Sequence, residues 1–226
     1  MKIVIASDFH LKINENEFDI ERRLRIEKFL KSLIGNIDCL ILAGDIFDLW
    51  IEWNTVIVKN YFSILSVFAQ LKDSGCRLVY IAGNHDFWLE KFLKNDIGFE
   101  TYDGDFTADF NNKKIFVSHG DLYTKNDIRY KVFRRVIRSK IVKYITKLIH
   151  PDISLKIGQL MSRSSRKKVI NDKKSFAKEL GLKIKAESLS DEYDLIVFGH
   201  SHNPKYLKIN NSIYINTGDW INQSSY

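Results

Sequence analysis

Histidine in this chain is concentrated at the ends of short apolar runs. Five of the six histidines follow such a run and stand near Asp, Asn or Gly. The chemically active residues at these run ends are Asp8, His10, Asp45, Asn84, His85, Asp86, His119, His200 and His202. Imidazole combined with carboxylate and amide oxygen suits Mn, Fe or Zn better than Ca or Mg. The sequence therefore predicts a metal centre, and we interpret the sixth histidine, His150, as incidental.

The ligand types indicate two cations. Residues i and i+2 leaving a strand can point the same way, so Asp8 and His10 can share one cation. A single carboxylate can bridge two cations, and Asp45 is the natural candidate. Two cations roughly 3.5–4 Å apart can activate a bridging water and stabilise both the attacking and the leaving oxygen of an in-line displacement. This chemistry predicts hydrolysis of a phosphate ester or anhydride.

The runs that carry these residues have the length and composition of β-strands. Most are apolar at consecutive positions, which is typical of strands covered on both faces. They span residues 3–7, 39–43, 78–82, 115–118, 195–198, 206–209 and 213–216. Apolar residues at helical spacing over 21–34 and 56–71, each followed by glycine, predict helices. This alternation predicts an α/β protein with layered sheets, and we interpret residues 1–226 as a single domain.

A strongly basic segment interrupts the alternation. Residues 125–174 contain sixteen Lys and Arg against three Asp, whereas the rest of the chain is net acidic within a formal charge of +7. Apolar residues recur every three or four positions over 130–148, which predicts an amphipathic cationic helix, and a second helical stretch is expected over about 153–180. We interpret about 125–180 as a helical insertion that meets an anionic partner. Ordinary core-facing helices with solvated charges are the alternative.

The remaining composition narrows the setting of the protein. No apolar run approaches the ~18–20 residues that span a bilayer. The first residues do not resemble a signal peptide, because the apolar run is short and meets Asp8 at once. Cys39 and Cys76 lie in apolar strand-like runs and indicate buried free thiols. These features favour a cytoplasmic protein.

Taken together, the motifs resemble the fingerprint of the calcineurin-like metallophosphoesterases. That fingerprint is Asp-X-His, Gly-Asp, Gly-Asn-His-Asp, a histidine before glycine, and Gly-His-X-His, and it covers residues 3 to about 219 here with no ligand position missing. The resemblance implies a four-layer α/β/β/α sandwich with a helical insertion. It implies one metal held by Asp8, His10, Asp45 and His202, and another held by Asp45, Asn84, His119 and His200. In the family, the position of His85 contacts the phosphate and the leaving oxygen, and that of Asp86 orients it.

A narrower resemblance is to one branch of this family, the UDP-2,3-diacylglucosamine diphosphatases of lipid A synthesis. It rests on residues 7–11 and 44–50, on the spacing from 119 to 134, on 161–166 and on 216–221. It implies hydrolysis of the pyrophosphate to UMP and 2,3-diacylglucosamine 1-phosphate with two divalent cations, Mn²⁺ before Fe or Zn. The insertion would cover the acyl chains and meet the anionic inner membrane from the cytoplasmic side. The implied substrate contacts are Asn84, His85, Asp127, Tyr130, Arg134, Ser165 and His200.

Two other functions remain open. A metal-dependent phosphodiesterase or nuclease could use the basic segment for nucleotides or nucleic acid, although the uncharged face of that segment is continuously apolar. A non-catalytic binding module on the same fold would be expected to have lost ligands, and every ligand position is kept here.

Overall fold

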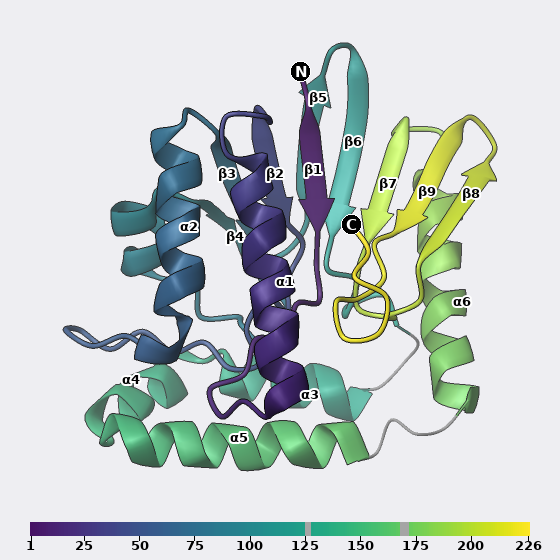
Figure 1. Cartoon of the computed structure of the whole chain (residues 1–226). Coiled ribbons are helices and arrows are strands. Elements are labelled where there is room, and N and C mark those ends of the chain that lie inside the picture. The colour runs from purple at the N-terminus through teal and green to yellow at the C-terminus, as the bar shows by residue number, and fades with distance from the viewer. Residues whose placement is uncertain (125–127, 168–171) are drawn as a thin grey trace.

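Two β-sheets lie against each other at the centre of the molecule (Figure 1). The computed structural model describes residues 1–124, 128–167 and 172–226, without the side chains of 128–130, 161–167 and 172–175. The first sheet has the order β1-β2-β3-β4, all parallel, and the second has the mixed order β5-β6-β7-β9-β8. The strands are β1 (Ile3–Ala6), β2 (Cys39–Leu42), β3 (Arg77–Ile81), β4 (Glu100–Tyr102), β5 (Phe106–Phe110), β6 (Lys113–Ser118), β7 (Leu195–Phe198), β8 (Lys205–Ile209) and β9 (Ser212–Asn216).

The facing sides of the sheets form one apolar layer. Ile41 and Val79 of the first sheet share a buried cluster with Phe106, Val117 and Val197 of the second. Consecutive residues of β2 and β3 are buried, because helices cover the opposite face of the first sheet. Strands covered on both faces produce the unbroken apolar runs in the sequence.

Helices cover the outer face of each sheet. α1 (Glu17–Leu33) and α2 (Phe62–Asp73) pack on the first sheet. α6 (Asp172–Leu189) places Leu182 and Ala186 in a buried cluster with the second sheet. The layers run helix, sheet, sheet, helix (Figure 1), which confirms the predicted α/β/β/α architecture.

Several element boundaries differ from the prediction for local reasons. α1 begins at Glu17, earlier than expected, because Asn16 and Asp19 form a reciprocal capping box. α2 begins later, after a 3₁₀ turn η1 (Lys59–Tyr61). The short strands β4 and β5 and the π-helical turn η2 (Phe92–Ile97) were not predicted.

Three helices run beneath the carboxyl ends of the strands (Figure 1): α3 (Ile128–Ile137), α4 (Lys140–Leu148) and α5 (Pro151–Lys167). The expected continuous helix over 130–148 is wrong, because Ser139 has an extended ψ of 147° and its side chain caps α4 by accepting the N–H of Val142. The helical stretch expected over about 153–180 is divided between two helices. α5 spans Pro151–Lys167, and α6 spans Asp172–Leu189 as the outer layer of the second sheet.

Candidate metal centre

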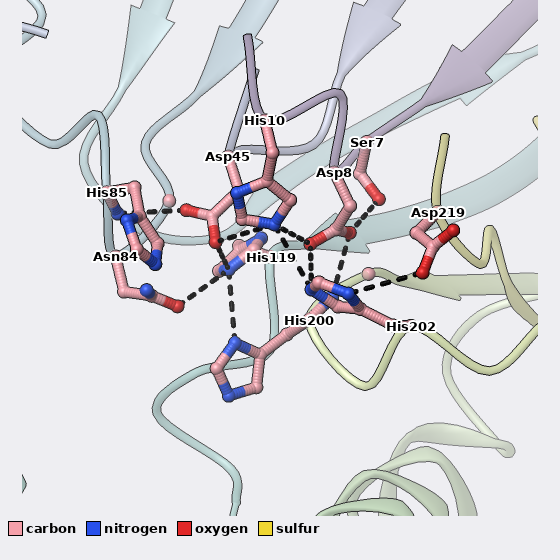
Figure 2. A network of polar contacts seen from close by, with 12 residues as sticks. Ser7, Asp8, His10, Asp45, Asn84, His85, His119, His200, His202 and Asp219 are labelled. Carbon is pink, nitrogen blue, oxygen red and sulfur yellow. Dashed lines mark hydrogen bonds and ion pairs between the residues drawn. The ribbon is translucent and has the colours of Figure 1, made fainter. Parts of the chain in front are cut away.

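Five strands end at one edge of the two sheets, and the loops that follow them meet there (Figures 1 and 2). β1, β2 and β3 come from the first sheet, whereas β6 and β7 come from the second. The loops bring together Asp8 and His10, Asp45, Asn84 and His85, His119, and His200 and His202. Seven of these residues were predicted as metal ligands, and they lie in two adjoining groups.

The first group, called the Asp8 group, consists of Asp8, His10 and His202. The Nε2 atoms of His10 and His202 are 3.2 Å apart. Oδ1 of Asp8 lies 3.2 Å from Nε2 of His202 and 3.6 Å from Nε2 of His10. Two ligands bound at about 2.1 Å to one cation are themselves about 3.0 to 3.4 Å apart. Two of the three spacings lie in that range and the third, 3.6 Å, is slightly longer, so the group suits a shared cation.

The second group, called the Asn84 group, consists of Asn84, His119 and His200. Nε2 of His119 lies 3.1 Å from Oδ1 of Asn84 and 3.3 Å from Nδ1 of His200. Asp45 stands between the two groups, with Oδ2 3.4 Å from Nε2 of His119 and 3.8 Å from Nε2 of His10. The carboxylate therefore occupies the position of a bridge.

The chemistry of these atoms is that of a cation site. Nδ1 of His10 faces the Asp48 carboxylate at 3.0 Å, that of His202 faces the Asp219 carboxylate at 3.3 Å, and that of His119 faces the carbonyl of Ala43 at 2.9 Å. In the neutral ring each Nδ1 donates its proton to these acceptors, which leaves Nε2 with a lone pair for a cation. The lone pairs converge with Oδ1 of Asp8, a buried atom without a hydrogen-bond partner. Acceptors that converge without a proton between them fit divalent cations.

The carboxylates of Asp8 and Asp45 each use one oxygen in hydrogen bonds to neighbouring loops and direct the other toward the centre. Oδ2 of Asp8 accepts bonds from the Ser7 hydroxyl and from the N–H of His200 at 3.0 Å. Oδ1 of Asp45 accepts the N–H of His85 at 2.9 Å. The other oxygen of each is thereby aimed at the histidine nitrogens.

The ligand-bearing loops have an unusual backbone. Asp8, His10, Asp45, His200 and His202 have φ values of 56°, 47°, 55°, 66° and 58°. Left-handed conformations of this kind are uncommon for residues with a side chain and are concentrated at functional sites. The loops are closely packed as well, because a Cβ at Gly83 would collide with the backbone and carboxylate of Asp45.

The charges of the centre depend on one another. Burial by itself would raise the pKa of the Asp8 carboxyl, but His202 and His10 hold it well below its usual range. Burial opposes a charge on His10, yet the bonds to Asp48 and Asp8 raise its pKa to about 10. Asp45 acts in the same way on His119 and raises its pKa to about 10 against the effect of burial. The carboxylates therefore favour positive charge in the centre, which either protons or cations can provide.

His85 and Asp86 have separate environments. Nδ1 of His85 lies 3.1 Å from the carbonyl of Asp48, so its Nε2 is the free nitrogen. The Asp86 carboxylate accepts hydrogen bonds from the Tyr80 hydroxyl and from the backbone N–H groups of Asp45, Ile46, Phe47 and Gly83. The expected orienting bond from Asp86 to His85 is thus replaced by the Asp48 carbonyl. Asp86 instead ties the loop after β2 to the loop after β3.

The structure describes the side chains of four of the seven predicted substrate contacts. Asn84, His85 and His200 lie in the centre (Figure 2). Arg134 bonds the buried carboxylate of Asp121 at 3.0 Å, in the loop after β6. Asp127 and the side chains of Tyr130 and Ser165 lie outside the described residues.

Sequence reasoning gave no role to two residues of the centre, Asp48 and Asp219. Both stand in motifs that it recognised, 44–50 and 216–221. Their histidine partners lie on other loops, so spacing along the chain contains no signal for the pairing. For Asp48, a second acid in the motif that carries Asp45 was the available hint.

Comparison with known proteins agrees with this geometry. Residues 1–204, which include every residue of both groups, match the calcineurin-like phosphoesterase family. A protein of Porphyromonas gingivalis (strain ATCC BAA-308 / W83) named UDP-2,3-diacylglucosamine hydrolase is 28% identical over 245 residues, covering 100% of this chain and 92% of the relative. Proteins with the same name from Vibrio atlanticus (strain LGP32) and Vibrio vulnificus (strain CMCP6) are 28% and 25% identical, with the same coverage. The chain is therefore a hydrolase that belongs to the calcineurin-like phosphoesterase family.

Proposed function

We propose that this enzyme hydrolyses the pyrophosphate of UDP-2,3-diacylglucosamine, releasing UMP and 2,3-diacylglucosamine 1-phosphate. The observation that supports the chemistry is the pair of acceptor-only groups with Asp45 between them. The support for the substrate is the likeness over the whole chain to proteins named for it. The cations we propose are two Mn²⁺, held by Asp8, His10, Asp45 and His202 and by Asp45, Asn84, His119 and His200.

The residues of the chain have distinct tasks in this reaction. When bound, the cations would supply an activated water and neutralise charge on the phosphorus oxygens. Asp45 holds the two groups at a fixed separation, and Asn84 offers a neutral oxygen. His85 presents Nε2, because the Asp48 carbonyl occupies its Nδ1. From that position, His85 would contact the phosphate and stabilise charge on the leaving oxygen.

The helices beneath the centre expose an unusual amount of apolar surface. No described helix has the length and apolar character needed to cross a membrane. The exposed apolar side chains are Val132, Phe133 and Val136 on α3, Ile141, Tyr144, Ile145 and Leu148 on α4, and Ile153, Ile157 and Leu160 on α5. Basic residues alternate with them along the same helices. Such helices bind anionic lipid surfaces and acyl chains, so we propose that the enzyme is attached peripherally to the cytoplasmic face of the inner membrane.

The same helices contact the loop that carries Asn84 and His85. Arg138 donates to the carbonyl of Gly83 at 2.7 Å and lies over the Phe87 ring at 5.1 Å. Lys143 and Lys147 both pair with Glu90 at 2.8 Å. An acyl chain resting on these helices would therefore be one loop away from the reacting phosphate.

These pairs weigh against the nucleic-acid alternative. Arg134, Arg138, Lys143 and Lys147 are paired with acids of the body. Basic side chains committed in this way are less available for a phosphate backbone, and the surface beside them is apolar.

Release of UMP from UDP-2,3-diacylglucosamine tests the proposal. The purified enzyme should form UMP with Mn²⁺ in mixed micelles and lose this activity with a chelator. The Asp45→Asn variant is the matched protein control and should form UMP at least about 100-fold more slowly. Activity on a small chromogenic phosphodiester without UMP formation would contradict the substrate. Salt-sensitive cleavage of single-stranded DNA would instead indicate that the substrate is a nucleic acid.

A further inference from the structure

The two groups of the centre differ in what lies behind their histidines. In the Asp8 group, both histidines donate Nδ1–H to carboxylates, His10 to Asp48 and His202 to Asp219. In the Asn84 group, His119 donates to the neutral carbonyl of Ala43. The Nδ1 of His200 faces the group itself. Among the described residues, the Nδ1–H bonds to carboxylates thus belong to the histidines of the Asp8 group.

The surrounding charge has the same asymmetry. The side chains of Asp48 and Asp219 are 8% and 0% exposed, so solvent screens their charges weakly. Around the Asn84 group, Lys178 adds to the effect of burial on His200, and Arg138 donates to the carbonyl of Gly83, next to Asn84. Two further carboxylates lie nearby. Asp86 already accepts several backbone N–H groups, and Asp121, which also acts on His119, is bonded by Arg134 at 3.0 Å. The Asp8 group is the more negative of the two.

We propose that Asp48 and Asp219 are positioning residues that give the Asp8 group a higher cation affinity than the Asn84 group, so that the two cations bind in sequence. A carboxylate on Nδ1 fixes the ring with Nε2 toward the cation and makes that nitrogen more basic. Loss of such a partner typically lowers metal affinity about 10- to 100-fold. This inference rests on the proposed two-cation centre, but it does not depend on the proposed substrate.

Titration of Mn²⁺ into the chelator-stripped full-length protein tests the inference, with free Mn²⁺ measured by its paramagnetic resonance signal. The wild type should bind in two steps separated by about tenfold or more. Asp48→Asn and Asp219→Asn keep an acceptor oxygen and remove the charge. Each should weaken the tighter step about 10- to 100-fold and leave the weaker step within about threefold. Asn84→Ala should abolish the weaker step and keep the tighter one.

Two controls separate positioning from a structural role. Asp219 also accepts the N–H of Asn222 at 2.7 Å, so a structural role predicts that Asp219→Asn lowers the stability of the metal-free protein and weakens both steps alike. Asp194→Asn removes a surface carboxylate just before β7, at the end of that strand opposite to the centre, and should change neither step.

The results distinguish this inference from the proposed function. Equal affinity for both cations in the wild type would overturn the inference and leave the two-cation enzyme standing. An unchanged tighter step in both Asn variants would do the same. A wild type that binds fewer than two Mn²⁺ would overturn both.

Discussion

At the scale of the residue, hydrogen bonds between loops hold the candidate ligand atoms in their orientations. Asp8 and Asp45 each bond a neighbouring loop through one oxygen, and this fixes the direction of the other. The positive φ values of the ligand residues each cost on the order of 1–3 kcal/mol. The bonds between loops stabilise that geometry, so the ligand atoms need little rearrangement on binding.

The first prediction concerns the bridge. Asp45→Asn should lower kcat by about 100- to 1,000-fold or more, because the neutral amide cannot neutralise two cations at once. The fold should persist, since the amide oxygen can still accept the N–H of His85. Steady-state kinetics and thermal unfolding check both statements. His150→Ala is the control, since this exposed histidine lies outside the centre; full activity in Asp45→Asn would refute the bridging role.

A second prediction follows from the bonds to Asp86. Asp86→Ala leaves several buried N–H groups without an acceptor, and each such group costs about 1–3 kcal/mol. The free energy of unfolding should fall by about 3 kcal/mol or more in urea titrations. A variant that unfolds like the wild type but fails in catalysis would instead support an orienting role toward His85.

The residues of the centre were predictable to different degrees. Histidines at strand ends are rare enough to indicate a site, so the sequence alone predicted seven ligand candidates. The structure brings these seven residues together. Asp48 is 38 positions from His10, and nothing along the chain links the two. Acids are common in turns, which makes an isolated Asp uninformative until the fold brings its partner to it.

At the scale of the element, strands covered on both faces were predictable and marginal ones were not. β2 and β7 are short apolar runs that end on ligand motifs. β4 has three residues, and β5 alternates exposed and buried positions beside a turn at Asn111 and Asn112. The break between α3 and α4 depends on Ser139, whose capping bond interrupts an apolar pattern that continues on both sides. Local capping therefore overrode periodicity.

A third prediction tests the exposed face of α4. Ile141 and Leu148 are 72% and 69% exposed, so replacing both with Ser should hardly change the free energy of unfolding. If these side chains enter a lipid surface, losing them should weaken binding to anionic vesicles roughly 100-fold. Vesicle sedimentation measures this. The matched control replaces Phe18 and Leu24, 78% and 53% exposed on α1, and should bind as the wild type does. Equal losses in both variants would exclude a specific role for α4.

At the scale of the whole molecule, the centre joins the two sheets. The candidate ligands after β1, β2 and β3 belong to the first sheet, and those after β6 and β7 belong to the second. Away from that edge, the facing sides of the sheets form an apolar layer. Cations bound by both sets of loops would therefore crosslink the halves of the sandwich at the edge where its strands end.

A fourth prediction follows from that crosslink. Ligands that bind only the folded state stabilise it, by about 2.7 kcal/mol at a concentration of 100 Kd. For a chain of this size, the Tm should rise by roughly 5–10 °C when Mn²⁺ is added to the chelator-stripped protein. Asp45→Asn should show a smaller rise, because it removes a carboxylate that faces both groups. Scanning calorimetry with and without chelator measures the difference. If the cations bound to the loops of one sheet only, the Tm of the wild type and of the variant would rise equally. Asp45 would then not link the two halves.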